Sequence, residues 1–248
     1  MLTFPISSFF CPTRIHLGIG AHTQLASVLQ GYDCQRLFIA LDRALQGGDF
    51  YQRIEAILAE QNIATAVFTD IEADPSDTTV ERAFAVCRAH NATAILAVGG
   101  GSTMDVAKAV GILATNGGRI HDYEGIEKFS KPPLPLIAIP TTAGTGSEVS
   151  GSCVISDTTR HLKMSIRHAA LNPAAVAILD PLALVTMPGH VAAHSGLDAF
   201  VHAFEAYISR QSNLVSDALR LQAVELLAAN IRPFLADRSH LDAGLHML

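Results

Sequence analysis

The feature that most constrains the fold is a strand-length apolar run followed at once by a glycine cluster that opens a helix. Residues 92–98 (ATAILAV) carry a single polar side chain, and residues 99–115 begin with three glycines and continue with helical periodicity. An apolar run without polar alternation is typical of a strand that is buried on both faces of a parallel sheet. The pattern therefore predicts an α/β protein built from β-α-β units.

The same alternation runs through the first two-thirds of the chain. Strand-like segments are residues 36–42, 65–70, 92–98, 134–140 and 174–180, and helix-like segments are residues 49–62 and 76–90, with Ser76 as an N-cap. This order predicts a doubly wound parallel sheet with helices on both faces. Residues 148–156 and 161–166 are expected to form two further strands that lie close together.

The strand pattern stops after Pro181. Residues 188–209, 213–236 and 241–248 have helical spacing, so we expect an α/β domain over residues 1–183 and the start of an all-α domain over residues 184–248. The last helix has no capping glycine or polar tail, which suggests a C-terminally incomplete chain. An unfinished helical domain should expose apolar faces and favour a homo-oligomer, with a dimer as the simplest form.

Composition excludes several classes of function. The net charge of −6 and the absence of tryptophan disfavour nucleic-acid partners, and no apolar run reaches the ~18 residues of a membrane span. The four cysteines are far apart and form no CxxC pair, which argues against disulfides and a structural zinc site. Residues 1–12 lack the features of a signal peptide. We therefore expect a cytoplasmic protein with neither nucleic-acid nor membrane partners.

The glycine cluster is the first candidate site. Gly99, Gly100 and Gly101 allow a close backbone approach, Ser102 offers a hydroxyl, and Asp105 follows within the same helical turn. A helix start presents unpaired N–H groups and a partial positive charge, which suit a phosphate. The alternative is a plain strand-to-helix turn, since neither the GxGxxG nor the GxxxxGK[ST] pattern is present.

The second candidate is the loop over residues 140–148, which also follows a buried strand. It carries the hydroxyls of Thr141, Thr142, Thr145 and Ser147 between small residues. Loops after the carboxyl ends of parallel strands form the ligand crevice of such sheets. A polar surface loop is the alternative interpretation.

The remaining candidates are the pair Asp198 and His202 and the single residue Asp42. Asp198 and His202 are four residues apart in a helical segment, so they share one face and could bind a divalent metal; a simple Asp–His hydrogen bond is the alternative. Asp42 ends a predicted strand, where it could accept hydrogen bonds from a ribose and favour NAD over NADP. At that position a helix N-cap is equally consistent with the sequence.

Taken together, three segments resemble the iron-containing (group III) alcohol dehydrogenases. These segments are GGGSTMDVAK (residues 99–108), PTTAGTGSEV (140–149) and GLDAFVHAFEAY (196–207), in the order and spacing of that family. The resemblance implies a dehydroquinate-synthase-like fold, with a dinucleotide-binding α/β domain before a helical one. It also implies NAD and an active-site divalent metal, usually Fe²⁺ and sometimes Zn²⁺.

The resemblance further implies roles for individual residues. Gly99 to Ser102 would hold the cofactor pyrophosphate, and Asp198 and His202 would be two metal ligands. The remaining cofactor positions would be Asp42 at the ribose, Asp74 near the adenine, Thr141, Thr142 and Ser147 along the nicotinamide and phosphate side, Lys163 near the cofactor, and Asp105 and Thr145 within the two motifs.

The implied activity is the NAD(H)-dependent interconversion of a small primary alcohol and its aldehyde. The resemblance covers roughly the first two-thirds of a family chain, and the family's other two histidine ligands would lie beyond residue 248. His194, one turn before Asp198, could line the same pocket. The alternatives are a glycerol-dehydrogenase-like polyol dehydrogenase, a nucleotide-binding fragment without turnover, and a self-associating interaction module.

Overall fold

The centre of the molecule is a six-stranded, fully parallel sheet. A computed structural model describes residues 6–210 and 213–248, so the first five residues of the predicted α/β domain lie outside the described part. The strands are β1 (Arg14–Leu17), β2 (Arg36–Leu41), β3 (Ala64–Phe68), β4 (Ala94–Gly99), β6 (Leu136–Pro140) and β9 (Val176–Leu179). Their order across the sheet is β1-β9-β6-β4-β2-β3.

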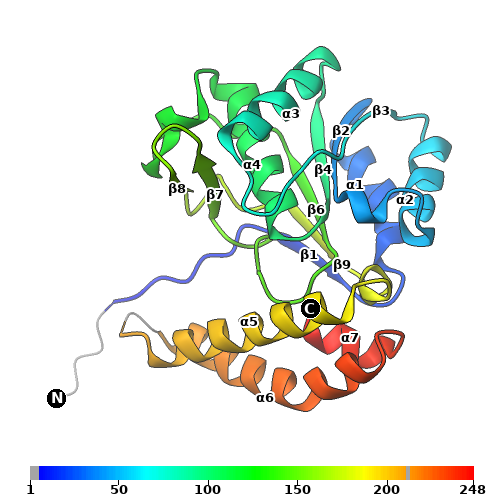
Figure 1. Cartoon of the computed structure of the whole chain (residues 1–248), viewed down its shortest axis with the longest axis vertical. Helices are drawn as coiled ribbons and strands as arrows, with labels where there is room; N and C mark the ends of the chain where they lie inside the picture. The colour runs from blue at the N-terminus through cyan, green and yellow to red at the C-terminus, as the bar shows by residue number, and fades with distance from the viewer. Residues whose placement is uncertain (1–5, 211–212) are drawn as a thin grey trace.

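Helices cover both faces of this sheet (Figure 1). They are α1 (Leu25–Gly31), α2 (Asp49–Glu60), α3 (Asp77–Ala89) and α4 (Gly101–Asn116). Ile95 and Ala97 of β4 belong to the core beneath α3 and α4, whereas Leu96 and Val98 belong to the core beneath α1 and α2. This two-sided burial explains the apolar run in β4 and confirms the predicted doubly wound sheet.

A second, three-stranded sheet flanks α4. It contains β5 (Gly125–Ile126), β8 (Leu162–Arg167) and β7 (Ser152–Asp157), with β7 and β8 paired antiparallel. The predicted strand over residues 148–156 is wrong for residues 148–151, which lie in a turn and bend. Gly146 has a φ of 60°, and Val149 N donates to Gly146 O at 3.1 Å, which closes this turn before the strand begins.

The last quarter of the chain is helical, as predicted. It consists of α5 (Gly189–Ile208), α6 (Leu214–Ala236) and α7 (Leu241–Met247), which form a layer below the sheet in Figure 1. Ala192, Ala203, Leu227, Phe234 and Met247 pack together among these helices, in a core that also includes Ala143 of the loop after β6. The loop after β6 rests against α5, which connects this layer to the sheet.

The helical layer also presents apolar side chains to solvent, as the sequence predicts. Phe204 and Ile208 of α5 and Leu214 and Leu219 of α6 are all exposed. Within the described ranges, no helix combines the length and the hydropathy that a membrane crossing requires. Cys11, Cys34, Cys87 and Cys153 are free thiols, which agrees with the predicted absence of disulfides.

Candidate cofactor and metal site

The glycine cluster forms the turn from β4 into α4. Gly99 ends the strand, Gly100 is the N-cap, and Gly101 is the first residue of the helix. A Cβ on Gly99 would lie 2.3 Å from Thr103 Oγ1, so packing alone requires glycine there. The first amide groups of α4 have no partner within the helix and are suited to an anion.

The threonine-rich loop after β6 packs directly on this turn. Thr141 N donates to Gly99 O at 3.1 Å. A Cβ on Gly100 would lie 3.2 Å from Thr142 Oγ1, and a Cβ on Gly101 would lie 3.3 Å from Thr145 Cγ2. The two motifs are therefore brought together, because β4 and β6 are neighbours in the sheet.

A cavity of about 340 Å³ opens beside the first turn of α4. It is lined by Gly101, Ser102, Asp105, Thr145, Ser147, Ser150, Ser152 and Val154. Five of these residues were candidates from the sequence, and most of the lining side chains can donate a hydrogen bond. Such a lining suits an oxygen-rich ligand.

Asp105, which lines this cavity, lies near the buried ammonium group of Lys108. Ser147 Oγ donates to Asp105 Oδ1 at 3.4 Å, and Lys108 Nζ donates to Ser150 O and Ser152 O, both at 2.8 Å. Burial raises the pKa of Asp105 to about 6, while the Lys108 ammonium opposes that rise. Burial lowers the pKa of Lys108.

Sequence reasoning missed Lys108 and its neighbour Glu148. Burial raises the pKa of Glu148, and Lys108 again opposes the shift. One feature of the sequence could have identified Lys108. It is a single lysine inside the otherwise apolar helical segment VAKAVGIL, three residues after Asp105. A charged residue in such a setting is expected to be paired when it is buried.

Asp42 lies at the same edge of the sheet. Its backbone N donates to Val98 O at 2.9 Å, which places it beside the end of β4. Its side chain accepts from Ala44 N at 3.0 Å and caps the 3-10 turn Arg43–Leu45. The N-cap interpretation is therefore what the structure shows, and the second carboxylate oxygen is not used by this cap.

Asp74 and Lys163 form an exposed ion pair with each other. Lys163 Nζ lies 2.8 Å from Asp74 Oδ1. Asp74 belongs to the loop after β3, and Lys163 belongs to β8, so the contact joins the two sheets. Ser156 Oγ also donates to Asp74 O at 3.1 Å and attaches the same loop to β7.

Asp198 and His202 share one face of α5, as predicted. Asp198 Oδ1 and His202 Nε2 are 3.8 Å apart, which is longer than a hydrogen bond. His202 Nδ1 lies 3.3 Å from Gly144 O, and His202 lines a cleft of about 560 Å³ together with Thr142 and Glu148. His202 of the α5 pair thus contacts the loop that packs on the glycine turn.

The donor chemistry of this α5 pair fits a divalent metal. A carboxylate and an imidazole are ligands of zinc and of iron. Among the described residues, the pair has no third Cys, His, Asp or Glu ligand atom within 4.8 Å. Asp198 and His202 could therefore supply only part of a metal site.

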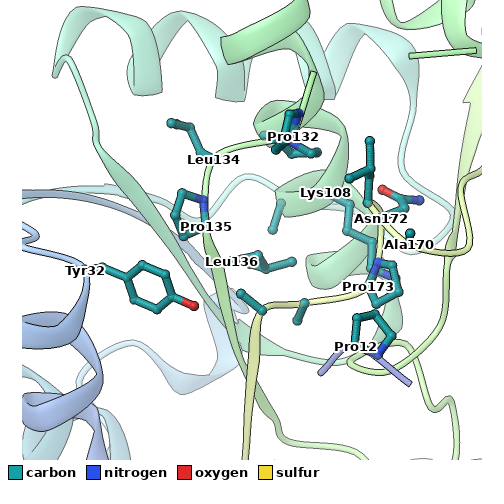
Figure 2. Close-up of a pocket in the computed structure, with 16 residues that line it drawn as sticks. Pro12, Tyr32, Lys108, Pro132, Leu134, Pro135, Leu136, Ala170, Asn172 and Pro173 are labelled. Carbon is teal, nitrogen blue, oxygen red and sulfur yellow. The ribbon is translucent and has the colours of Figure 1, made fainter. Parts of the chain in front are cut away.

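A separate cavity lies at the amino ends of β6 and β9. Figure 2 shows Pro132, Leu134, Pro135 and Leu136 along one side of it and Asn172 and Pro173 along another. None of the residues predicted for the site lines this cavity. The candidate site is therefore at the opposite, carboxyl edge of the sheet.

Comparison with known proteins establishes the family. Residues 12–181 match "Iron-containing alcohol dehydrogenase", and residues 192–248 match "Fe-containing alcohol dehydrogenase family, C-terminal". The chain belongs to the iron-containing alcohol dehydrogenase family. The resemblance expected from the three motifs is thereby confirmed, as is the fold class of that family.

Individual relatives show the extent of the similarity. The chain is 34% identical over 238 residues to an NAD-dependent methanol dehydrogenase of Bacillus methanolicus, covering 96% of this chain and 62% of the relative. It is 38% identical over 246 residues to a 1,3-propanediol dehydrogenase of Klebsiella pneumoniae, covering 98% and 61%. A solved 1,3-propanediol oxidoreductase superposes with a TM-score of 0.94 at 35% identity, covering 98% of this chain and 63% of that one. The chain therefore spans about three-fifths of the length of these relatives.

Proposed function

We propose that the protein is an NAD(H)-dependent oxidoreductase that interconverts a small primary alcohol and its aldehyde with a divalent metal, iron or alternatively zinc. The observation that carries this proposal is a chain of contacts at the carboxyl edge of the sheet. The glycine turn touches the threonine-rich loop, and Gly144 of that loop touches His202. A cofactor on the turn and a metal at His202 would thus face each other across one loop.

The relatives support the substrate class. Two of them are named as methanol and 1,3-propanediol dehydrogenases, and both names denote small alcohols. The run TTAGTGSE at residues 141–148 belongs to the motif that carries the family resemblance. We infer the same substrate class for this protein and place the polyol-dehydrogenase alternative second.

We assign the cofactor to the carboxyl edge. The pyrophosphate would accept hydrogen bonds from the amides of the turn and from Ser102, because α4 presents its unpaired N–H groups there. Asp42 would accept from the ribose with the carboxylate oxygen that its cap leaves unused. The Asp74–Lys163 pair would lie towards the adenine end. Thr141, Thr142, Thr145, Ser147 and Asp105 would surround the remaining part of the cofactor.

We assign the metal to Asp198 and His202, with further ligands outside the described residues. When bound, a divalent metal supplies Lewis-acid stabilisation of the substrate oxygen, and the nicotinamide exchanges the hydride. The chain's own contribution is positioning. Gly144 O holds one ring nitrogen of His202, which orients the other towards Asp198.

We also propose the organisation of the whole protein. Residues 1–183 would bind the cofactor, and residues 184–248 would begin the metal-binding domain. The core of α5 to α7, whose buried members come from residues 184–248 except for Ala143, supports this division. The exposed apolar side chains on α5 and α6 support a homo-oligomer such as a dimer, and the free cysteines support a cytoplasmic location.

The test combines cofactor binding, metal content and turnover on the same preparation. The chain is purified without oxygen, loaded with Fe²⁺ or Zn²⁺, and titrated with NADH. We expect NADH to bind, and we expect the metal content to fall by one ion per chain in Asp198→Ala. His190→Ala, on an exposed part of the same helix, is the matched control.

The outcomes separate the candidate functions. NADH binding together with Asp198-dependent metal and oxidation of small alcohols would support the dehydrogenase. NADH binding with neither metal nor turnover would support the nucleotide-binding fragment for this chain. Failure to bind NADH would contradict the assignment of the glycine turn.

A further inference from the structure

Three metal-ligating side chains converge at a place far from α5. Asp77 is the first residue of α3, His121 lies in the 3-10 turn Ile120–Tyr123, and Asp157 is the last residue of β7. One ligand atom of each lies within 4.8 Å of the other two. Among the described residues, this is the only such group of three.

The distances are those of ligands around one ion. His121 Nε2 lies 3.1 Å from Asp77 Oδ2 and 3.4 Å from Asp157 Oδ2. Two ligands at ~2.1 Å from a metal are about 3.0 Å apart at a right angle and about 3.4 Å apart at a tetrahedral angle. These two distances are therefore compatible with ligands of one ion, and the third separation is within 4.8 Å.

The group is withdrawn from solvent and incompletely paired. Asp77 is 4% exposed and Asp157 is 2% exposed, and the His121 side chain is 19% exposed. Within the described part of the chain, neither ring nitrogen of His121 forms a hydrogen bond. Nε2 is close to both carboxylates but aligned with neither as a hydrogen bond, so a buried polar atom is left without a partner.

Backbone donors hold both carboxylates in orientation. Asp77 Oδ1 accepts from Thr78 N at 2.9 Å and from Thr158 N at 3.3 Å. Asp157 Oδ1 accepts from Thr159 N and Arg160 N, both at 2.8 Å. Each carboxylate thus has one oxygen fixed by the backbone. Asp77 Oδ2 lies next to His121, whereas Asp157 Oδ2 lies next to His121 and also accepts from Arg160 Nε. Outer hydrogen bonds of this kind are typical of metal ligands.

The local charge also favours a cation. Arg160 Nε lies 2.5 Å from Asp157 Oδ2, and Arg160 also pairs with Glu124 at 2.7 Å. Asp77, Asp157 and Glu124 carry three negative charges against the single guanidinium. The three carboxylates therefore exceed the guanidinium by two negative charges, and two of them, Asp77 and Asp157, are buried.

We propose that Asp77, His121 and Asp157 bind one divalent transition-metal ion of the zinc class, at a site separate from the α5 pair. The imidazole favours such an ion over Mg²⁺ or Ca²⁺, which prefer oxygen ligands throughout. Water would complete the coordination on the exposed side of His121.

An ion at this place would connect three segments. It would join the start of α3, the turn after α4 and the β7–β8 hairpin. Ser156, next to Asp157, donates from N to Pro75 O at 2.8 Å and from Oγ to Asp74 O at 3.1 Å. The ion would therefore stiffen the loop that carries Asp74.

The test counts zinc in a background that lacks the other site. The double variant Asp198→Ala/His202→Ala is stripped with a chelator, titrated with Zn²⁺ by calorimetry and analysed for metal content after dialysis. We expect one Zn²⁺ per chain, a higher Tm with zinc than without it, and visible absorption from a coordinated ion when Co²⁺ replaces zinc.

Substitutions of the proposed ligands test whether that ion binds at Asp77, His121 and Asp157. In the same background, His121→Gln and Asp77→Asn should each weaken zinc binding at least tenfold. His246→Gln is the matched control, because His246 faces Asp242 in an exposed pair at 3.8 Å; zinc binding should not change. Far-UV circular dichroism of the zinc-free variants checks that each is folded. If His121→Gln does not fold, Asp77→Asn alone tests the position of the ion.

Two results would overturn the proposal. One is a folded background protein that binds no zinc. The other is zinc binding that survives both His121→Gln and Asp77→Asn, which would place the ion elsewhere. Neither result depends on alcohol turnover, so each is distinguishable from failure of the proposed function.

Discussion

Gly144 lies so close to Ser195 that no side chain fits between them. A Cβ on Gly144 would lie 2.1 Å from Ser195 O, and the φ of Gly144 is 134°. This contact presses the loop after β6 against α5, next to the hydrogen-bond contact of Gly144 O with His202. The relative placement of the proposed cofactor and metal residues therefore depends on one glycine.

Gly144→Ala should disturb both stability and NADH binding. The added methyl group would meet backbone atoms, which cannot move as a flexible side chain can, at a φ that L-residues rarely adopt. We expect a loss of roughly 2–4 kcal/mol in the free energy of unfolding, measured with urea, and weaker NADH binding. Gly146→Ala is the control, since its φ is 60° and no atom lies within 4 Å of the new Cβ. It should cost about 1–2 kcal/mol, and an equal cost in both variants would contradict the argument.

Lys108→Met should be strongly destabilising despite the similar size of the two side chains. The change removes the donor to Ser150 O and Ser152 O and leaves Asp105 and Glu148 without their nearby cation. Breaking a buried ionic group in this way costs about 3–5 kcal/mol. Lys163→Met, which removes an exposed lysine, should cost less than about 1 kcal/mol. Urea unfolding of both variants measures the difference, and equal losses would show that the burial of Lys108 contributes little.

The parts of the fold that the sequence predicts are those with a local signal. The sequence predicts the strand β4 and the N-cap Ser76, because two-sided burial and helix capping each require particular residue types within a few positions. The structure has this cap, in which Ser76 Oγ accepts from Thr79 N at 3.3 Å. β1 (Arg14–Leu17) was not predicted, because it is an edge strand whose side chains are mostly exposed. Its pairing with β9 depends on residues more than 150 positions away.

The candidate site likewise contains contacts that the sequence predicts and contacts that it does not. The glycine turn and the threonine-rich loop could be placed together from the sequence, because parallel strands carry their following loops to one edge. The Asp74–Lys163 contact and the convergence of His121 with Asp77 depend on tertiary folding and have no local pattern. Lys108 was overlooked because the sequence does not show that its ammonium reaches two backbone carbonyls.

NADH binding should depend on pH through Asp105. The pKa of Asp105 is raised to about 6, so the carboxyl is mostly neutral below pH 6 and charged above it. A negative charge in the cavity at the start of α4 opposes the anionic phosphates of the cofactor. The dissociation constant should therefore rise by about tenfold between pH 5 and pH 7.5, which corresponds to an unfavourable interaction of about 1.4 kcal/mol.

The variant Asp105→Asn separates this effect from other titrations. The amide is neutral at every pH and has nearly the same shape, so the variant should keep the low-pH affinity up to pH 7.5. Fluorescence titration with NADH at several pH values measures both curves. If the variant showed the same rise as the wild type, the titrating group would lie elsewhere.

Asp180→Ala should be among the most damaging substitutions outside the site. Asp180 is fully buried at the end of β9 and accepts from Gly20 N at 3.2 Å, His22 N at 3.0 Å and Leu182 N at 3.1 Å. Its Oδ2 also lies 2.6 Å from His22 Nδ1. Alanine would leave these donors buried without an acceptor, so we expect a loss of about 3 kcal/mol or more in the free energy of unfolding. Asp237→Ala is the control, since Asp237 caps an exposed turn through Ser239 and should cost about 1 kcal/mol. If the two losses were equal, water would have to reach the donors around Asp180, and the attachment of the β1–α1 connection to β9 would not depend on this carboxylate.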